Sequence, residues 1–262
     1  MSPVYQSLKS EPDMTINTPS NNAKTVLLIG AGGGIAKALA ELLNNDENVT
    51  TLISVSRNQQ AVLSTKHTHY IVDSHNEAEI KAFMLEQKQH TAFTHIYCCT
   101  GVLHTSGDKK LKPEKRLEDM NAEQFTEYFK VNTVVPAMWL KHAVNVVDKA
   151  GATIVVFSAR VGSISENQLG GWYGYRASKA ALNMIIKTAA VEYKRRAANT
   201  NLVCYHPGTV DTELSKPFQS NVKPGKLFEA TFTASQLIKH TSDLDPERSP
   251  YYIDWDGKTI QW

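Results

Sequence analysis

From residue 25 onward, short β-branched apolar runs alternate with longer helical stretches. The apolar runs predict strands at 25–30, 51–56, 69–73, 95–101, 152–159, 201–208 and 250–257. The stretches between them predict helices at 34–45, 77–89, 122–147, 174–197 and 228–240. Strands that are apolar on both faces and are followed by helices indicate a parallel sheet covered on both sides. We therefore expect one Rossmann-like, doubly wound α/β domain with three αβα layers and about seven strands.

The boundaries of this domain follow from the composition of the two ends. Residues 24–262 carry the alternating pattern, whereas residues 1–23 are rich in Ser, Asn and Pro and predict a flexible tail. Pro136 lies inside the long helix predicted at 122–147, where it predicts a kink or a loosened turn.

Charge and composition exclude several partner classes. The formal net charge of +2 is too small to indicate nucleic acid, and no apolar run is long enough to span a membrane. The N-terminal residues lack the apolar core of a secretory signal, and the three cysteines lack disulfide spacing, so a cytoplasmic protein is expected. His67 and His69 have a ligand-like spacing, but no acidic or Cys cluster completes a metal site. We expect them at the surface or at a strand edge.

A glycine cluster separates the first strand from the first helix in "LLIGAGGGIAKALA". Glycines at this turn let backbone N–H groups at the helix start approach a pyrophosphate, although a tight turn alone would also need them. The strict G-x-G-x-x-G spacing fails because position 35 is Ile35, but Gly30-x3-Gly34-x-Ala36 fits. The expected cofactor contacts here are Gly30, Gly32, Gly33, Gly34 and Ile35.

The end of the second strand predicts which dinucleotide binds. An NAD site needs a carboxylate there for the ribose 2′-hydroxyl, but this chain has Ser56 and Arg57 and no acid from residue 48 to residue 72. A guanidinium beside a hydroxyl suits a 2′-phosphate, so NADP(H) is preferred over NAD(H). The alternative is that Arg57 is simply a solvated surface residue.

Tyr175 and Lys179 lie one helical turn apart, on the same face of the helix predicted at 174–197. A nearby ammonium stabilises a phenolate and lowers the pKa of the phenol. Such a tyrosine can pass a proton to or from a reacting oxygen. The spacing alone is weak evidence for a catalytic pair, but the evidence is stronger when the pair opens a helix that follows the fifth strand of a sheet predicted to bind a dinucleotide.

With these pieces in order, the chain resembles the short-chain dehydrogenase/reductase family from about residue 25 to Trp262. The matching motifs are G-x3-G-I-A at 30–36, "VD" at 72–73, "VN" at 131–132, "YRASK" at 175–179, "HPGTVDT" at 206–212 and "DWDGKTIQW" at 254–262. The stretch "SARVGSISENQLGGWYGYRASKAALNM" is similar to a subgroup of carbonyl reductases related to the C-signal proteins.

The resemblance implies roles for individual residues. Tyr175 would donate a proton to a substrate carbonyl during hydride transfer, and Lys179 would lower its pKa and bind the nicotinamide ribose. Asn132 would hold a water that relays protons to Lys179, and Asp73 would hydrogen-bond the adenine. The expected remaining cofactor contacts are Gly101, Pro207, Gly208, Val210 and Thr212.

Two departures from the family pattern bear on catalysis. The usual Asn-Asn-Ala-Gly after the fourth strand is "CCTG", Cys98 to Gly101. The serine that polarises the carbonyl would fall on Ala159, which leaves Ser158 and Ser163 as alternative donors, or no serine at all. A missing oxyanion donor slows catalysis.

The predicted function is reduction of a small-molecule carbonyl by NADPH, or oxidation of the corresponding alcohol. Trp172, Tyr173 and Phe218 flank the expected substrate cleft and are candidates for an apolar pocket. The competing hypothesis is an NADP(H)-binding sensor or signalling protein with weak catalysis. An epimerase or dehydratase is disfavoured by the short C-terminal part. Family resemblance also suggests a homodimer or homotetramer through the helices that carry Asn132 and Tyr175.

Overall fold

The computed structural model describes residues 23–105 and 111–262, so residues 1–22 of the tail predicted at 1–23, and residues 106–110, lie outside it. A seven-stranded sheet crosses the molecule in the order β3-β2-β1-β4-β5-β6-β9, with every neighbouring pair parallel. The strands are β1 Lys24–Ile29, β2 Val49–Ser56, β3 His67–Ile71, β4 His95–Cys98, β5 Ala152–Phe157, β6 Thr200–His206 and β9 Tyr251–Asp254. The predicted doubly wound αβα fold is therefore confirmed.

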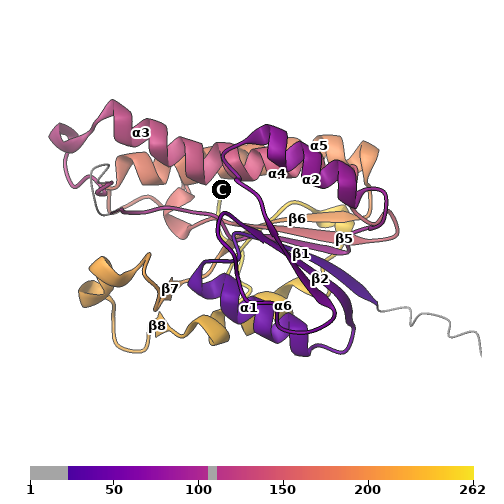
Figure 1. The fold of residues 1–262 in the computed structure, drawn as a ribbon. Helices are drawn as coiled ribbons and strands as arrows, with labels where there is room; N and C mark the ends of the chain where they lie inside the picture. Colours follow the sequence, from indigo (N-terminus) through magenta and orange to yellow (C-terminus); the bar gives the residue numbers. More distant parts are fainter. Residues whose placement is uncertain (1–22, 106–110) are drawn as a thin grey trace, which may run out of the picture.

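Helices cover both faces of this sheet (Figure 1). On one face lie α1 Gly34–Asn45 and α6 Ala230–Thr241, whose apolar side chains pack on β1, β5 and β6. On the other lie α2 Glu77–Gln87, α4 Val135–Ala143 and α5 Tyr173–Arg196, which bury a second apolar cluster. Both faces of the central strands β1, β4, β5 and β6 are buried, which explains their continuous apolar runs in the sequence. None of the helices in the described part of the chain is long and apolar enough to cross a membrane.

The long helix predicted at 122–147 is interrupted, as Pro136 suggested. It consists of α3 Ala122–Phe129, a π-helical turn η2 Lys130–Val134 and α4. The N–H of Val135 donates to the carbonyl of Lys130, five residues back. Pro136 directly follows and has no N–H to continue the regular pattern. The widened turn faces Asn132 inward, where the residue is fully buried.

All seven strands point the same way, so their carboxyl ends meet along one edge of the sheet. The strand order reverses between β1 and β4, and ligands of open α/β sheets bind at such a switch point. Beside this edge, β7 Thr209–Val210 pairs with β8 Leu227–Phe228. This two-stranded pair was not predicted, because each of its strands is only two residues long.

Candidate active site

A cleft of about 770 Å³ opens at the carboxyl edge of the sheet. Its walls come from the glycine turn after β1, the segments after β4, β5 and β6, and the first turns of α5. This volume lies within the range of pockets that bury a small molecule. The cleft joins the two sequence features that predicted function, since Gly32 and Tyr175 both line it.

The glycine turn forms one end of the cleft, lined by Gly32, Gly33, Gly34 and Ile35. Gly30 ends β1 with a φ of +80°, a conformation that other residues rarely adopt. A Cβ at Gly34 would lie 2.7 Å from Cγ2 of Thr212, so a larger residue would collide with the opposite wall. Helix α1 begins at Gly34 with no side-chain cap and no acid in its first turn. Its free N–H groups and open backbone fit a pyrophosphate.

Ser56, Arg57 and Asp73 lie at the ends of β2 and β3, beyond the glycine end of the cleft. Arg57 is exposed and makes no hydrogen bond or ion pair within the described residues. The Ser56 hydroxyl donates to the carbonyl of Asn58 at 2.6 Å. Asp73 accepts a hydrogen bond from the N–H of His75 at 3.0 Å and keeps nearly half of its side chain exposed. None of the three side chains lines the cleft itself.

Tyr175 and Lys179 face the cleft from the first two turns of α5, as their spacing predicted. Both are buried, and Nζ of Lys179 lies 5.9 Å from the centroid of the Tyr175 ring. Nζ donates to the carbonyl of Phe157 at 2.7 Å, which anchors the ammonium at the end of β5. Gly162 makes room for the helix, because a Cβ there would lie 2.8 Å from Cβ of Lys179.

The electrostatics of this pair differ from the expectation that Lys179 lowers the pKa of Tyr175. Burial raises the pKa of the Tyr175 phenol above its usual value, with a smaller contribution from Tyr252. Burial also lowers the pKa of Lys179 to about 8. Removal from water is the main cause in both cases, since desolvation disfavours the charged form of each group. The phenol therefore keeps its proton at neutral pH.

Asn132 contacts the chain rather than Lys179. Its Oδ1 accepts from the N–H of Val102 at 2.8 Å, and its Nδ2 donates to the Val102 carbonyl at 3.0 Å and to Oγ of Ser178 at 3.1 Å. These bonds fix the segment that follows β4. A Cβ at Gly101 would lie 3.5 Å from Nζ of Lys179 and 3.6 Å from Oδ1 of Asn132. Gly101 thus allows the two side chains to approach the same space.

Neither candidate serine presents a free hydroxyl to the cleft. Ser158 is among the residues that line the cleft, but its buried hydroxyl donates to Oδ1 of Asn183 at 2.7 Å. Ser163 does not line the cleft, and its Oγ accepts from the N–H of Glu166 at 3.2 Å. Ala159 does line it and packs in one cluster with Tyr175. Side chains alternate along an extended strand, which turns Ser158 away from the face that Ala159 occupies.

The segment after β6 adds a backbone turn to the wall of the cleft. Pro207, Gly208, Val210 and Thr212 line the cleft, and Thr212 meets the glycine turn at Gly34. Gly208 has a φ of +79°, and a Cβ there would lie 2.7 Å from the ring of Phe228.

Two of the three aromatic pocket candidates reach the cleft. The rings of Trp172 and Phe218 are 5.2 Å apart, and Trp172 also packs against Tyr175 at 6.1 Å. Both residues line the cleft, but Tyr173 does not, because it begins α5 on another side of the helix from Tyr175. The substrate end is therefore apolar and aromatic.

Glu114 is a functional candidate that the sequence did not reveal. It is buried, its Oε2 accepts from the N–H of Gly174 at 3.2 Å, and its Oε1 has no partner in the described part of the chain. Trp172 precedes α5 in a left-handed conformation and supplies no side-chain cap. Glu114 therefore caps this helix from a segment 60 residues away. In the sequence Glu114 stands in the charged stretch "DKKLKPEKR" at 108–116, a pattern typical of a solvated loop.

His206 was also missed. It lines the cleft at the end of β6, and its Nδ1 is buried with no partner among the residues described. Burial, with a smaller contribution from Arg160, lowers its pKa to about 4, against the opposing effect of Asp254. Only its position before Pro207 could have suggested that it reaches the cleft.

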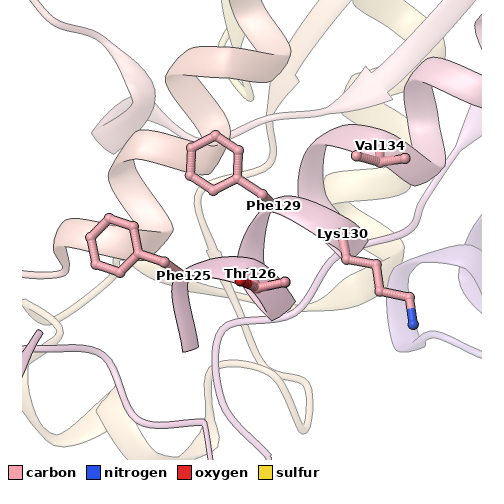
Figure 2. Close-up of a pocket in the computed structure, with 5 residues that line it drawn as sticks. All are labelled: Phe125, Thr126, Phe129, Lys130 and Val134. Carbon is pink, nitrogen blue, oxygen red and sulfur yellow. The ribbon is translucent and has the colours of Figure 1, made fainter. Parts of the chain in front are cut away.

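A separate hollow lies on α3 and η2, lined by Phe125, Thr126, Phe129, Lys130 and Val134. Figure 2 shows the rings of Phe125 and Phe129 one turn apart on the same helix, with the Lys130 chain extending away from them. This face belongs to the element for which a subunit contact was predicted.

The fold and the cleft define a class: a Rossmann-like α/β protein with a glycine turn and a Tyr-Lys pair at the carboxyl edge of its parallel sheet. Residues 24–223 match the family described as short chain dehydrogenase. The chain therefore belongs to the short-chain dehydrogenase/reductase family of oxidoreductases.

Curated relatives agree with this assignment. The 1-hydroxy-2-glutathionyl-2-methyl-3-butene dehydrogenase of Rhodococcus sp. strain AD45 is 28% identical over 91% of this chain and 99% of its own length. The C-signal protein of Myxococcus xanthus is 30% identical over 40% of this chain and 58% of its own. A benzil reductase of Saccharomyces cerevisiae, which forms (S)-benzoin, is 26% identical over 86% of both chains.

Solved structures share the fold. The carbonyl reductase Sniffer of Drosophila melanogaster has a TM-score of 0.76 and 20% identity, covering 92% of this chain and all of its own. An NADPH-bound carbonyl reductase from chicken fatty liver has a TM-score of 0.75 with the same identity and coverage. At this identity, the likeness demonstrates the architecture only.

Proposed function

We propose that this protein is an NADPH-dependent carbonyl reductase in which Tyr175 donates the proton and Lys179 assists it. The observation that carries the proposal is the shared cleft: the glycine turn at one end, and the buried Tyr175–Lys179 pair before the aromatic end. The relatives and structural neighbours include a benzil reductase and two carbonyl reductases, which supports this reaction class.

The residues present fit the dinucleotide. The backbone of Gly32, Gly33 and Gly34 would hold its pyrophosphate, and Arg57 with Ser56 would hold a 2′-phosphate. When bound, the cofactor supplies the hydride. Pro207 and Val210 would bound the nicotinamide end of the cleft.

Tyr175 keeps its proton because burial raises the pKa of its phenol. The hydroxyl can therefore donate to an oxygen that gains negative charge as the carbonyl is reduced. The charge of Lys179, one turn along α5, stabilises the phenolate that remains. Trp172 and Phe218 exclude water from that space and suit a flat, apolar substrate.

The test is consumption of NADPH against a panel of aldehydes, ketones and aromatic diketones. Tyr175→Phe should lower kcat/KM by about 100-fold or more, the usual contribution of a positioned acid. Tyr173→Phe is the matched control, because it removes a neighbouring hydroxyl outside the cleft. Full activity of Tyr175→Phe would refute the proposed mechanism.

A second candidate function is that of an NADP(H)-binding sensor. Ala159 at the position of the family serine, and the Ser158 hydroxyl already bonded to Asn183, favour it. Tight NADPH binding with no turnover on any carbonyl of the panel would support the sensor over the enzyme.

A further inference from the structure

A chain of hydrogen bonds ties β2 and β3 to the loop at residues 57–66. Ser54 on β2 is buried between two rings of β3: its Oγ lies 2.8 Å from Nε2 of His67 and 2.8 Å from Nδ1 of His69. This series of hydrogen bonds through His67, Ser54 and His69, called the relay below, ends in the loop on both sides. The N–H of Leu63 donates to Nδ1 of His67 at 3.1 Å, and Nε2 of His69 lies 3.1 Å from the carbonyl of Asn58.

The two ends fix the direction of every bond between them. Because the Leu63 N–H can only donate, Nδ1 of His67 is unprotonated and its Nε2 carries the proton, which goes to Ser54. The Ser54 hydroxyl must then donate onward to Nδ1 of His69. That leaves the proton of His69 on Nε2, where the Asn58 carbonyl accepts it. Nδ1 of His67 can accept from the Leu63 N–H only while this ring is neutral, and burial lowers the pKa of His67 in the direction that favours the neutral form.

The loop that the relay holds adjoins the cofactor cleft. The Asn58 carbonyl also accepts from Oγ of Ser56 at 2.6 Å and from Nε2 of Gln60 at 3.2 Å. That Gln60 nitrogen lies 3.6 Å from the position that a Cβ would take at Gly32, in the glycine turn. Arg57 stands between Ser56 and Asn58 with its side chain exposed. The relay thus fixes the backbone on either side of the proposed 2′-phosphate contact.

We propose that His67, Ser54 and His69 are positioning residues that hold the loop at 57–63 against the glycine turn, and so set the affinity for the adenosine end of the dinucleotide. This inference rests on the proposed function for the identity of the cofactor. The two histidines lie on β3, an edge strand of the sheet, as expected, but His67 is buried and both rings take part in the relay.

Ser54→Ala breaks the relay at its centre. We expect the Kd and KM for NADPH to rise about 5- to 20-fold, the usual effect of losing one buried hydrogen bond, with kcat at saturating NADPH changed by less than about two-fold. The Kd for NADH should rise less, because NADH lacks the 2′-phosphate that Arg57 would contact. A purely structural loss would lower stability, but it would not raise KM while leaving kcat unchanged, and it would not raise the Kd for NADPH more than the Kd for NADH.

Two further variants make the test specific. His69→Gln offers both an acceptor and a donor and should restore part of the affinity, whereas His69→Leu should match Ser54→Ala. Thr68→Ala is the matched control: Thr68 lies between the two histidines on β3, is exposed, and points to the opposite face of the sheet. It should bind NADPH like the unaltered protein.

Amide hydrogen exchange gives a readout without cofactor. The N–H of Leu63 should exchange about ten-fold faster in Ser54→Ala than in Thr68→Ala, because its acceptor is released. Equal exchange together with an unchanged Kd for NADPH would overturn the relay while leaving the proposed function standing. If the unaltered protein prefers NADH, the NADP(H) preference falls and the relay is judged on the NADH Kd of Ser54→Ala. If neither dinucleotide binds, both proposals are overturned.

Discussion

Replacing Ala159 by serine is expected to accelerate carbonyl reduction. Ala159 is 7% exposed, lines the cleft and packs in the same cluster as Tyr175. Its backbone is extended, with φ −151° and ψ 143°, a conformation that serine adopts freely. A hydroxyl at this Cβ would face the space in which Tyr175 meets the substrate oxygen.

The size of the gain follows from the burial of that position. A preorganised oxyanion donor contributes about 100- to 1000-fold to kcat. Because no neighbouring group has been placed to orient the new hydroxyl, we expect a smaller gain in kcat of about 10- to 100-fold, as for one hydrogen bond to a charged group. Burial of the hydroxyl should cost about 1 kcal/mol in the free energy of unfolding.

The assay compares kcat for NADPH-dependent reduction in Ala159→Ser and Ser158→Ala, with unfolding in urea measured on both. Ser158→Ala removes the buried bond to Asn183 and should lower the unfolding free energy by about 1 to 2 kcal/mol, with kcat changed by less than about two-fold. A large loss of kcat in Ser158→Ala would mean that the Ser158 hydroxyl leaves Asn183 and contacts the substrate. An absent gain in Ala159→Ser would refute the assignment of position 159.

Three further predictions concern the helix that carries the reactive pair and its surroundings. Burial lowers the pKa of Lys179 to about 8, so its charge is lost as pH rises through this value and kcat for reduction should fall above about pH 8. Lys179→Arg should abolish this fall, because arginine stays charged. A kcat that stays constant to about pH 10 in the unaltered protein would contradict the reasoning. Glu114→Ala should lower kcat about 10-fold and Tm by several degrees, whereas Glu114→Gln, which keeps an acceptor for the N–H of Gly174, should retain most of kcat. Asn76→Ala is the control, because it removes the cap of α2 and should lower Tm alone. Equal kcat in all three variants would show that Glu114 does not position α5. Phe129→Asp should shift the mass measured by light scattering from oligomer to monomer if the hollow on α3 is a subunit contact, and an unchanged oligomer would exclude that face.

The fold could be predicted because each element carries its own signal. The stretch predicted at 34–45 coincides with α1, since a glycine turn precedes it and a polar Asn-Asn-Asp run ends it. Pro136 predicted the loosened turn, although the π-helical residues lie just before it. The cleft could be predicted for the same reason, because Gly34, Tyr175 and Pro207 belong to local motifs whose positions after strand ends were already predicted.

What remained hidden depends on contacts between segments far apart in the chain. Glu114 meets Gly174 only after α3 and β5 have folded between them, and a charged loop gives no sign of a buried carboxylate. The histidines of β3 form a relay because Ser54 of β2 lies between them, and this juxtaposition exists only in the assembled sheet. A single sequence shows residue types and spacing, but not which distant partner satisfies a buried polar group.

The π-helical turn at Lys130–Val134 also restricts how this chain can vary in length. Such a turn contains one residue more than the α-helical turn it replaces, so a one-residue deletion there would restore regular helix and leave α3 and α4 nearly in phase. Tyr128, whose hydroxyl donates to the carbonyl of Leu103, would then keep its place beside Tyr175. The same deletion inside α3 or α4 would rotate one part of the helix by about 100° relative to the other, so length changes in related chains should fall at this turn rather than within either helix.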